Sequence, residues 1–231
     1  MKKILLSAWR LIASGFVAVC ISYFMALVKV SAVIGSGKFC FSLIHAFIPL
    51  IGIFAGLGTT LFYMITKMVL HYGIFDMFSC AWLAFCGFAS LCASLYWTHP
   101  TIMTRCMMPL LCIILFVLHP VGGAAWLYSC YWLIPIAIYW TEKKSVFLDC
   151  IATTFIQHAV GSVLMVYGGS LSAAVWLSLI PFVICERLLL AFAMMGMYYM
   201  GMLAAKKISQ IKIGGQFLDV LGKNSVKKCN V

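Results

Sequence analysis

The sequence predicts an all-α integral membrane bundle of about six transmembrane helices, with one or two broken or re-entrant elements. The first reason is composition, because 65% of the 231 residues are hydrophobic and only 9% are charged. A soluble domain carries roughly a quarter charged residues. So few charges cannot cover a globular surface in water, and the apolar content is too high for a disordered chain. Lipid is therefore expected to cover most of the surface.

The second reason is that the apolar residues fall into long segments. A helix needs about 20 apolar residues to cross a hydrocarbon layer about 30 Å thick. The expected spans, in chain order, are residues 11–28, 41–65, 77–97, 106–140, 146–167 and 171–205. Short polar segments rich in Gly, Ser, Thr, Lys or His separate these spans.

Two of these segments, 106–140 and 171–205, are too long for one straight crossing. Each has 35 residues, which corresponds to about 52 Å of helix. The run from His119 through Pro120 to Gly123 is expected to break the first segment, and Pro181 with Glu186-Arg187 to interrupt the second. Six spans result if neither segment folds into a hairpin, eight if both do, and seven if only one does.

Charge at the two ends of the chain favours an even number of crossings. Lys2, Lys3 and Arg10 give the N-terminus a charge of +3, and after Ala205 six lysines against Asp219 give +5, out of a net +11. Basic residues beside membrane spans tend to remain in the cytoplasm. Both termini are therefore expected to be cytoplasmic and the protein to lie in the plasma (inner) membrane. An odd count would place the termini on opposite sides.

The expected domain organisation follows from the same charges. Residues 1–205 form a multi-pass transmembrane domain, and residues 206–231 form a basic cytoplasmic tail. Apolar residues spaced along this tail suit a short helix on the inner membrane surface. Nucleic-acid binding is not expected, because the basic residues lie at the ends of spans without interleaved aromatic residues.

The sequence does not predict an enzyme, a metal site or a cofactor. Metal-dependent and phosphoryl-transfer chemistry needs clustered acids, and the five acids are scattered; they are Asp76, Glu142, Asp149, Glu186 and Asp219. No H-E-x-x-H, G-x-S-x-G or C-x-x-C motif occurs. Ser162, four residues after His158, leaves a Ser–His hydrolase as an alternative.

Small residues recur every four positions on the first two spans. Ser14, Ala18, Ser22 and Ala26 share one helix face, and Gly52, Gly56 and Thr60 follow the same spacing. Small faces let helices approach closely in lipid. The stripe on the first span therefore either packs inside the protein or docks against a partner membrane protein.

The first ~100 residues resemble the substrate-binding (S) subunits of energy-coupling-factor vitamin transporters. The resemblance rests on the size of the chain, the small-residue stripe, and the pattern Phe41-Ser42, Ile48-Pro49-Leu50, Gly52 and Gly56. It implies six helices with cytoplasmic ends. It also implies that the stripe docks on a membrane coupling subunit, and that an ATPase supplies the energy.

Aromatic residues gather just after the expected break in segment 106–140. They are Trp126, Tyr128, Tyr131 and Trp132. Tyr and Trp often concentrate at the membrane surface, which is one interpretation. The other is that rings beside a helix break line a pocket and stack on a planar ligand.

Ionisable residues inside apolar segments form the last candidate set. His158, Glu186 and Arg187 are the principal ones, and each is costly in a bilayer unless it is paired or hydrated. Side chains of adjacent residues point about 100° apart on a helix, so Glu186 and Arg187 are expected to need other partners, such as His158 or Gln157. They belong to a substrate site, to a structural network, or to the end of a span.

The function predicted from these features is the substrate-binding component of an uptake transporter for a small, vitamin-like, ring-containing molecule. The expected substrate-binding residues are Trp126, Tyr128, Tyr131, Trp132, His158, Glu186 and Arg187, and the partners are the lipid bilayer, a coupling subunit and an ATPase. The alternative is a non-catalytic membrane interaction or assembly protein without a ligand. A filled, dry interior would favour the alternative, and a polar-lined cavity opening beside Trp126 and Glu186 would favour transport.

Overall fold

The computed structural model describes residues 2–27, 29–32, 40–72, 87–141, 145–169 and 171–210. The elements in chain order are α1 (Lys2–Leu27), β1 (Lys29–Ala32), β2 (Cys40–Ser42), α2 (Ile44–Ala55), α3 (Leu57–Tyr72), α5 (Phe88–Thr98), the π-helix η1 (Met103–Met107), α6 (Met108–Leu118), α7 (Pro120–Ala124), the 3-10 helix η2 (Trp126–Trp132), α8 (Leu133–Trp140), α9 (Val146–Gly168) and α10 (Ala173–Gln210). The predicted helical class is confirmed. The two short strands pair antiparallel and are a minor addition.

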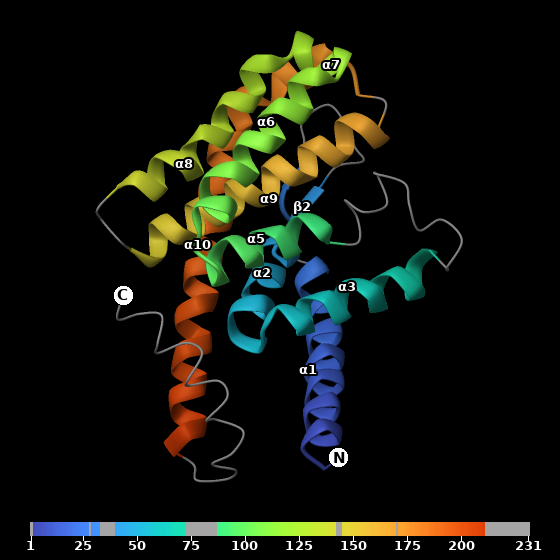
Figure 1. The fold of residues 1–231 in the computed structure, drawn as a ribbon, viewed down its shortest axis with the longest axis vertical. Coiled ribbons are helices and arrows are strands. Elements are labelled where there is room, and N and C mark those ends of the chain that lie inside the picture. The colour runs from blue at the N-terminus through green and yellow to red at the C-terminus, as the bar shows by residue number, and fades with distance from the viewer. Residues whose placement is uncertain are drawn as a thin grey trace.

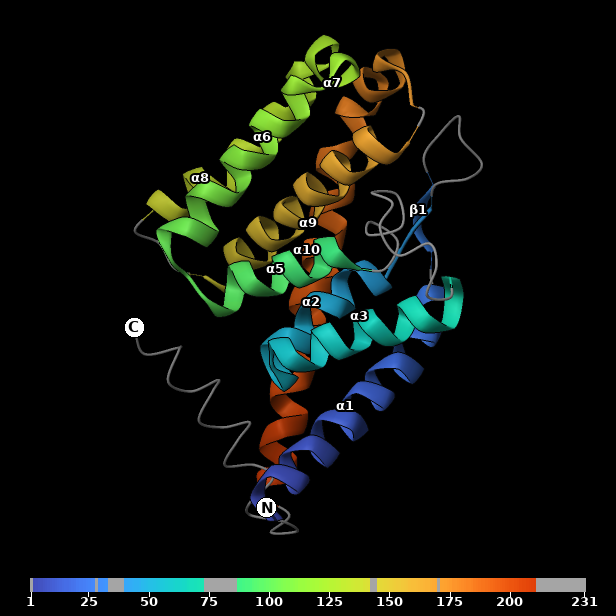
Figure 2. The same cartoon turned by 45° about the vertical axis from the view of Figure 1, so that its right-hand side comes forward.

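The helices form two groups that α10 connects (Figures 1 and 2). In both views α6, α8, α9 and the upper half of α10 lie alongside one another at one end of the molecule. α1 and α3 lie at the other end, and α2 and α5 lie between the two groups. α1 begins, and α10 ends, at the same end of the molecule.

The segment expected to be one span at 41–65 is divided into α2 and α3. Gly56 separates them with φ +91°, a backbone conformation that glycine adopts readily because it has no Cβ. The 12 residues of α2 and the 16 residues of α3 correspond to about 18 and 24 Å of helix. The prediction of one continuous helix here is wrong. Of the span expected at 77–97, residues 77–86 lie outside the described residues.

The block 106–140 folds into a helical hairpin. α6 ends at Leu118, His119 is extended, and the chain turns through α7 and returns through η2 and α8 along α6 (Figures 1 and 2). His119 Nδ1 accepts a hydrogen bond from the Val121 amide at 3.3 Å and so caps α7. A Cβ on Gly122 would overlap the Phe116 carbonyl oxygen, so only glycine fits at this turn. The predicted break at His119–Gly123 is confirmed.

The second long block is one continuous helix. α10 has 38 residues with Pro181 inside it, about 57 Å in all. The predicted interruption at Pro181 and Glu186-Arg187 is therefore wrong. Pro181 removes one backbone hydrogen bond and lies on the exposed surface. Only the first of the two long blocks folds back on itself. If the other expected segments each cross once, this corresponds to seven spans, the odd count that the terminal charges disfavour.

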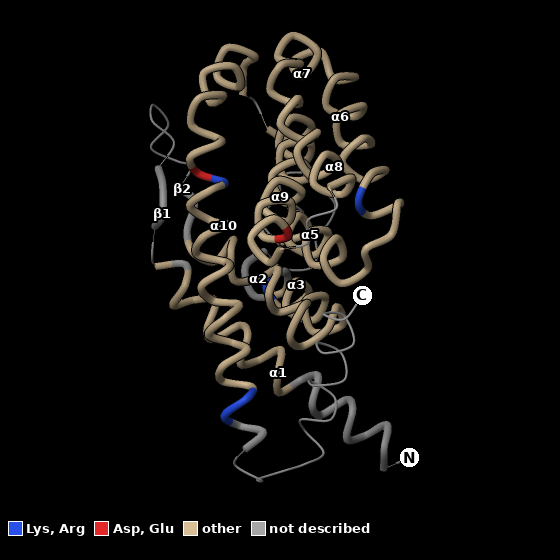
Figure 3. Tube along the Cα trace, turned by 90° about the vertical axis from the view of Figure 1, so that its left-hand side faces the viewer, with Lys and Arg blue, Asp and Glu red and all other residues tan. Residues whose placement is uncertain are grey.

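Two helices among the described residues are long and apolar enough to cross a membrane. They are α9 and the part of α10 from Ala173 to Lys207. Eight large apolar side chains of α10 are exposed: Leu177, Phe182, Ile184, Leu189, Phe192, Tyr199, Met200 and Leu203. Charged positions on the described trace are few, and those of α10 are confined to one spot near its middle and to its C-terminal end (Figure 3).

The predicted boundary at residue 205 does not coincide with the end of a helix. α10 continues through Ala205 to Gln210. The remainder of the expected cytoplasmic tail, residues 211–231, lies outside the described residues.

Candidate functional site

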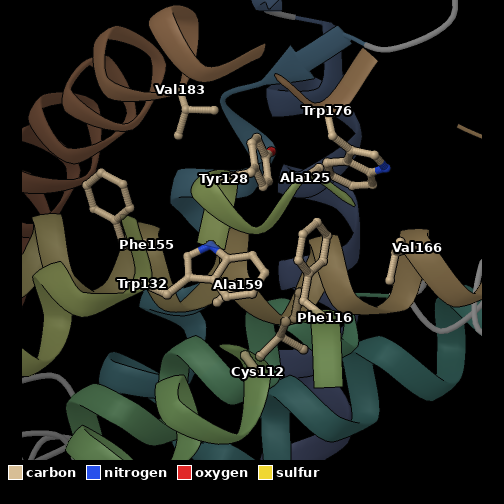
Figure 4. Packing of buried hydrophobic residues seen from close by; sticks show 12 residues of the cluster. Cys112, Phe116, Ala125, Tyr128, Trp132, Phe155, Ala159, Val166, Trp176 and Val183 are labelled. Atoms are coloured by element: carbon tan, nitrogen blue, oxygen red, sulfur yellow. The ribbon is translucent and has the colours of Figure 1, made fainter. Parts of the chain in front are cut away.

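The hairpin delivers two of the predicted aromatic residues to the centre of the upper helix group. Tyr128 and Trp132 on η2 are 2% and 0% exposed. Phe116 of α6 and Trp176 of α10 join them, with ring centroids of Phe116 5.2 Å from Trp132 and 5.3 Å from Trp176. Figure 4 shows Phe116 between the two indoles and the Tyr128 ring beside them. We call Phe116, Tyr128, Trp132 and Trp176 the ring cluster.

The side chains of η2 divide between a buried and an exposed side. Tyr128, Ser129 and Trp132 are buried while Trp126 is 54% exposed. Tyr131 lies at the edge, where its hydroxyl donates to the Ile180 carbonyl of α10 at 2.9 Å. The predicted residue Trp126 is therefore not part of the buried site, because η2 directs it outward.

His158 of α9 is the polar residue closest to the ring cluster. Its imidazole centroid lies 5.3 Å from that of Tyr128 and 6.5 Å from that of Trp132, and the residue is 7% exposed. Arg187 lies within electrostatic range of His158. Ser162, one turn along α9, interacts with the Tyr128 hydroxyl. The structure therefore places His158 beside two of the aromatic residues that the sequence assigned to the site.

Glu186 and Arg187 form an ion pair with each other. Arg187 Nη2 lies 3.1 Å from Glu186 Oε2, and the two side chains are 2% and 10% exposed. The two adjacent residues therefore contact each other, and Arg187 also interacts electrostatically with His158, one of the expected partners. The Thr154 hydroxyl of α9 also contacts the Arg187 carbonyl at 3.4 Å. Figure 3 shows the pair as adjoining red and blue positions midway along α10.

The charged pair and the ring cluster belong to one region between α2, α9, α10 and η2. Arg187 interacts electrostatically with Tyr128 and His158 and also with His45 of α2. The Glu186 carboxylate is the opposite charge that compensates the buried Arg187 guanidinium, because removing a charge from water costs several kcal/mol. The structure therefore brings together Tyr128, Trp132, His158 and the Glu186–Arg187 pair, with Tyr131 at the edge.

Three buried nitrogen atoms of this region have no hydrogen-bond partner among the described residues. They are Trp132 Nε1, Trp176 Nε1 and His158 Nε2. An unpaired buried polar atom costs about 1–3 kcal/mol. In Figure 4 the Trp132 nitrogen lies on the side of its ring facing Tyr128 and Phe155, while the Trp176 nitrogen lies on the side away from the cluster. These unpaired nitrogen atoms distinguish the region from an ordinary apolar core.

A polar contact between α9 and α5 supports the position of His158. Gln157 Nε2 donates to Ser90 Oγ at 2.6 Å, and Ser94 Oγ donates to the Pro49 carbonyl of α2 at 3.0 Å. All four residues are buried. Neutral hydrogen bonds of this kind hold helices together in lipid at about 1 kcal/mol each.

The open end of the hairpin is fastened by a charged contact. Arg105 Nη1 of η1 lies 3.0 Å from Asp149 Oδ1 of α9, and its guanidinium lies 4.6 Å from the Tyr96 ring centre. The Tyr96 hydroxyl donates to the Pro135 carbonyl of α8 at 3.2 Å. These contacts join both arms of the hairpin to α5 and α9, and so fix the position of η2.

The small-residue stripe of α1 packs inside the protein. Ala18 and Ser22 are 6% and 4% exposed, and the Ser14 hydroxyl lies 3.4 Å from that of Thr59 on α3. The opposite face of α1 is exposed, including Phe16 and Phe24. The hypothesis that Ser14, Ala18 and Ser22 dock on a partner is therefore not supported, since α2 and α3 already cover them. The side chain of the fourth member, Ala26, lies outside the described residues.

Phe116 and Trp176 are the members of the ring cluster that the sequence did not single out as site residues. They come from α6 and α10, 60 positions apart, and no local pattern marks them. Among the described residues, no group of three or more His, Cys, Asp or Glu side chains could hold a metal ion.

Comparison with known proteins gives no assignment. No family model matches the chain. No curated protein and no solved structure matches it either.

Proposed function

We propose that this protein is a multi-pass membrane protein that binds a small, ring-containing molecule in its interior, as the substrate-binding component of an uptake transporter. The supporting observation is the ring cluster with His158 beside it, where buried nitrogen atoms have no hydrogen-bond partner. Ligand sites commonly combine aromatic walls with a few polar groups, and they form between the helices of bundles.

A plasma-membrane location with both termini cytoplasmic, and therefore an even number of spans, forms part of the proposal. The basic residues at both ends of the chain support it, as does the location of the start of α1 and the end of α10 at the same end of the molecule (Figures 1 and 2). A reporter domain that is active only in the cytoplasm is expected to give a signal when it is fused to either terminus. A reporter that is active only in the periplasm is expected to give none. A periplasmic signal from one terminus would show an odd number of crossings.

Transport driven by ATP would require partner subunits. The sequence contains no G-x-x-x-x-G-K-[ST] phosphate-binding loop, so a membrane coupling subunit and an ATPase are proposed as partners. Because Ser14, Ala18 and Ser22 are covered by α2 and α3, such a partner would contact other surfaces. Exposed apolar faces of α1, α3, α6 and α10 are available among the described residues.

Close packing of the rings favours a second candidate, a membrane interaction or assembly protein without a ligand. Phe116 and Trp132 are fully buried and contact each other edge to face. Such contacts stabilise a core by about 0.5–1.5 kcal/mol per pair without any ligand. The two candidates differ in whether the purified protein carries a small molecule.

Mass spectrometry of the detergent-purified protein tests the proposal. The wild type is expected to release a small ring compound on denaturation, and the Trp132→Ala variant to release several-fold less, because it loses one wall of the site. Trp126→Ala is the matched control, since Trp126 is on the same helix but 54% exposed, and it should retain the compound. Partner chains without any small molecule in the wild type would instead establish the assembly role.

A further inference from the structure

The unpaired nitrogen atoms of the site differ in what they can bind. An indole nitrogen carries a hydrogen and is only a donor, whereas a neutral imidazole nitrogen is a donor or an acceptor depending on its tautomer. Trp132 Nε1 and Trp176 Nε1 are therefore unpaired donors. His158 Nε2 can therefore act as a hydrogen-bond donor or as an acceptor.

The hydroxyl groups of the same region are already engaged. Tyr131 donates to the Ile180 carbonyl at 2.9 Å, and the Tyr128 hydroxyl interacts with Ser162. Ser129 donates to the Trp126 carbonyl at 2.7 Å. The donors left unpaired around the rings are therefore the indole N–H groups, and a molecule bound against one of them must supply an acceptor.

Only one of the two indoles directs its nitrogen into the site. The Trp132 nitrogen lies on the side of the ring that faces Tyr128 and Phe155, and the Trp176 nitrogen lies on the outer side of the cluster (Figure 4). His158 lies against both Tyr128 and Trp132. The His158 ring thus lies next to the Trp132 ring, and Trp176 contributes its ring surface alone.

We infer that the ligand is a planar ring compound bearing a hydrogen-bond acceptor, such as a carbonyl or carboxylate oxygen, which accepts from Trp132 Nε1. His158 Nε2 makes the second polar contact, and Phe116 and Trp176 supply apolar ring faces. This inference rests on the proposed function, and it specifies the chemical class of the substrate. Acceptor chemistry is selected because a ligand offering only donors would leave the Trp132 N–H buried and unpaired.

Three simple ring compounds of similar size distinguish the possible chemistries. Benzamide carries a neutral carbonyl, benzoate carries a carboxylate, and benzylamine carries a donor group without an acceptor at neutral pH. Binding of each is measured by the shift in melting temperature of the detergent-purified full-length protein and by quenching of its tryptophan fluorescence. Benzamide, benzoate or both are expected to bind, and benzylamine at least tenfold more weakly.

Two matched variants test the role of Trp132. Trp132→Phe retains an aromatic ring but removes the donor, and it is expected to weaken binding of the acceptor compounds about tenfold. Trp126→Phe removes an indole donor on the same helix that is 54% exposed and outside the site, and it is expected to leave this binding nearly unchanged. Circular dichroism and melting of both variants without probe establish whether each remains folded.

Each other outcome overturns a defined part of the proposal. If benzylamine binds as well as the acceptor compounds, or if Trp132→Phe and Trp126→Phe weaken binding equally, the acceptor inference fails while ligand binding stands. If none of the three compounds binds to the wild type at millimolar concentration, and no small molecule is released on denaturation, both the inference and the proposed function fail.

Discussion

Replacing Arg187 with methionine is expected to lower the free energy of unfolding by about 3–5 kcal/mol, because it leaves the buried Glu186 carboxylate without its partner. The two charged groups lie 3.1 Å apart and the Arg187 side chain is only 2% exposed. Methionine is unbranched like the arginine stem but shorter, so the double variant described next separates the effect of charge from that of lost packing. Loss of α-helical signal on heating, measured in detergent, gives the difference in stability.

A double variant and a surface variant serve as controls for this prediction. Glu186→Leu combined with Arg187→Met removes both charges, and it should recover most of the stability, since well-packed apolar residues often replace a buried ion pair at little cost. Lys207→Met removes an exposed charge from the end of α10 and should change stability by less than about 0.5 kcal/mol. If the double variant is as unstable as Arg187→Met alone, the pair has another structural role.

Local sequence signals predicted the backbone well where a residue determines the conformation at its own position. Pro120 and Gly122 end α6 and allow the turn because proline lacks an N–H and glycine lacks a Cβ. Pro181 belongs to the same class of signal but does not end α10. One lost hydrogen bond, that from position 181 to the Leu177 carbonyl, is tolerated when the flanking turns remain helical. Gly56 shows the converse, because an isolated glycine in an apolar segment gives little warning of a break.

From the sequence, the site could be predicted only for residues that lie close together on one short segment or that stand out by their own chemistry. Tyr128 and Trp132 lie on the same element, so their shared burial follows from η2 alone. His158 was identified because an ionisable residue inside an apolar helix is costly. Phe116 and Trp176 could not be identified, since they depend on how α6 and α10 pack against η2. The same limit applies to the α1 stripe, because spacing shows that Ala18 fits a close helix contact but not which helix supplies it.

Gly122→Ala is expected to destabilise the protein by about 1–3 kcal/mol or more, since the added Cβ would overlap the Phe116 carbonyl oxygen and force the hairpin apart. Phe116 lies in the ring cluster, so the shift should also displace Tyr128 and Trp132, and lower ligand affinity together with stability. Gly196→Ala is the matched control, because nothing lies within 4 Å of a Cβ there. Alanine is the better helix former by about 1 kcal/mol, so Gly196→Ala should leave stability unchanged or raise it slightly. Melting temperature and tryptophan emission of the two variants measure both effects, and equal behaviour of the two would show that the hairpin turn does not control the site.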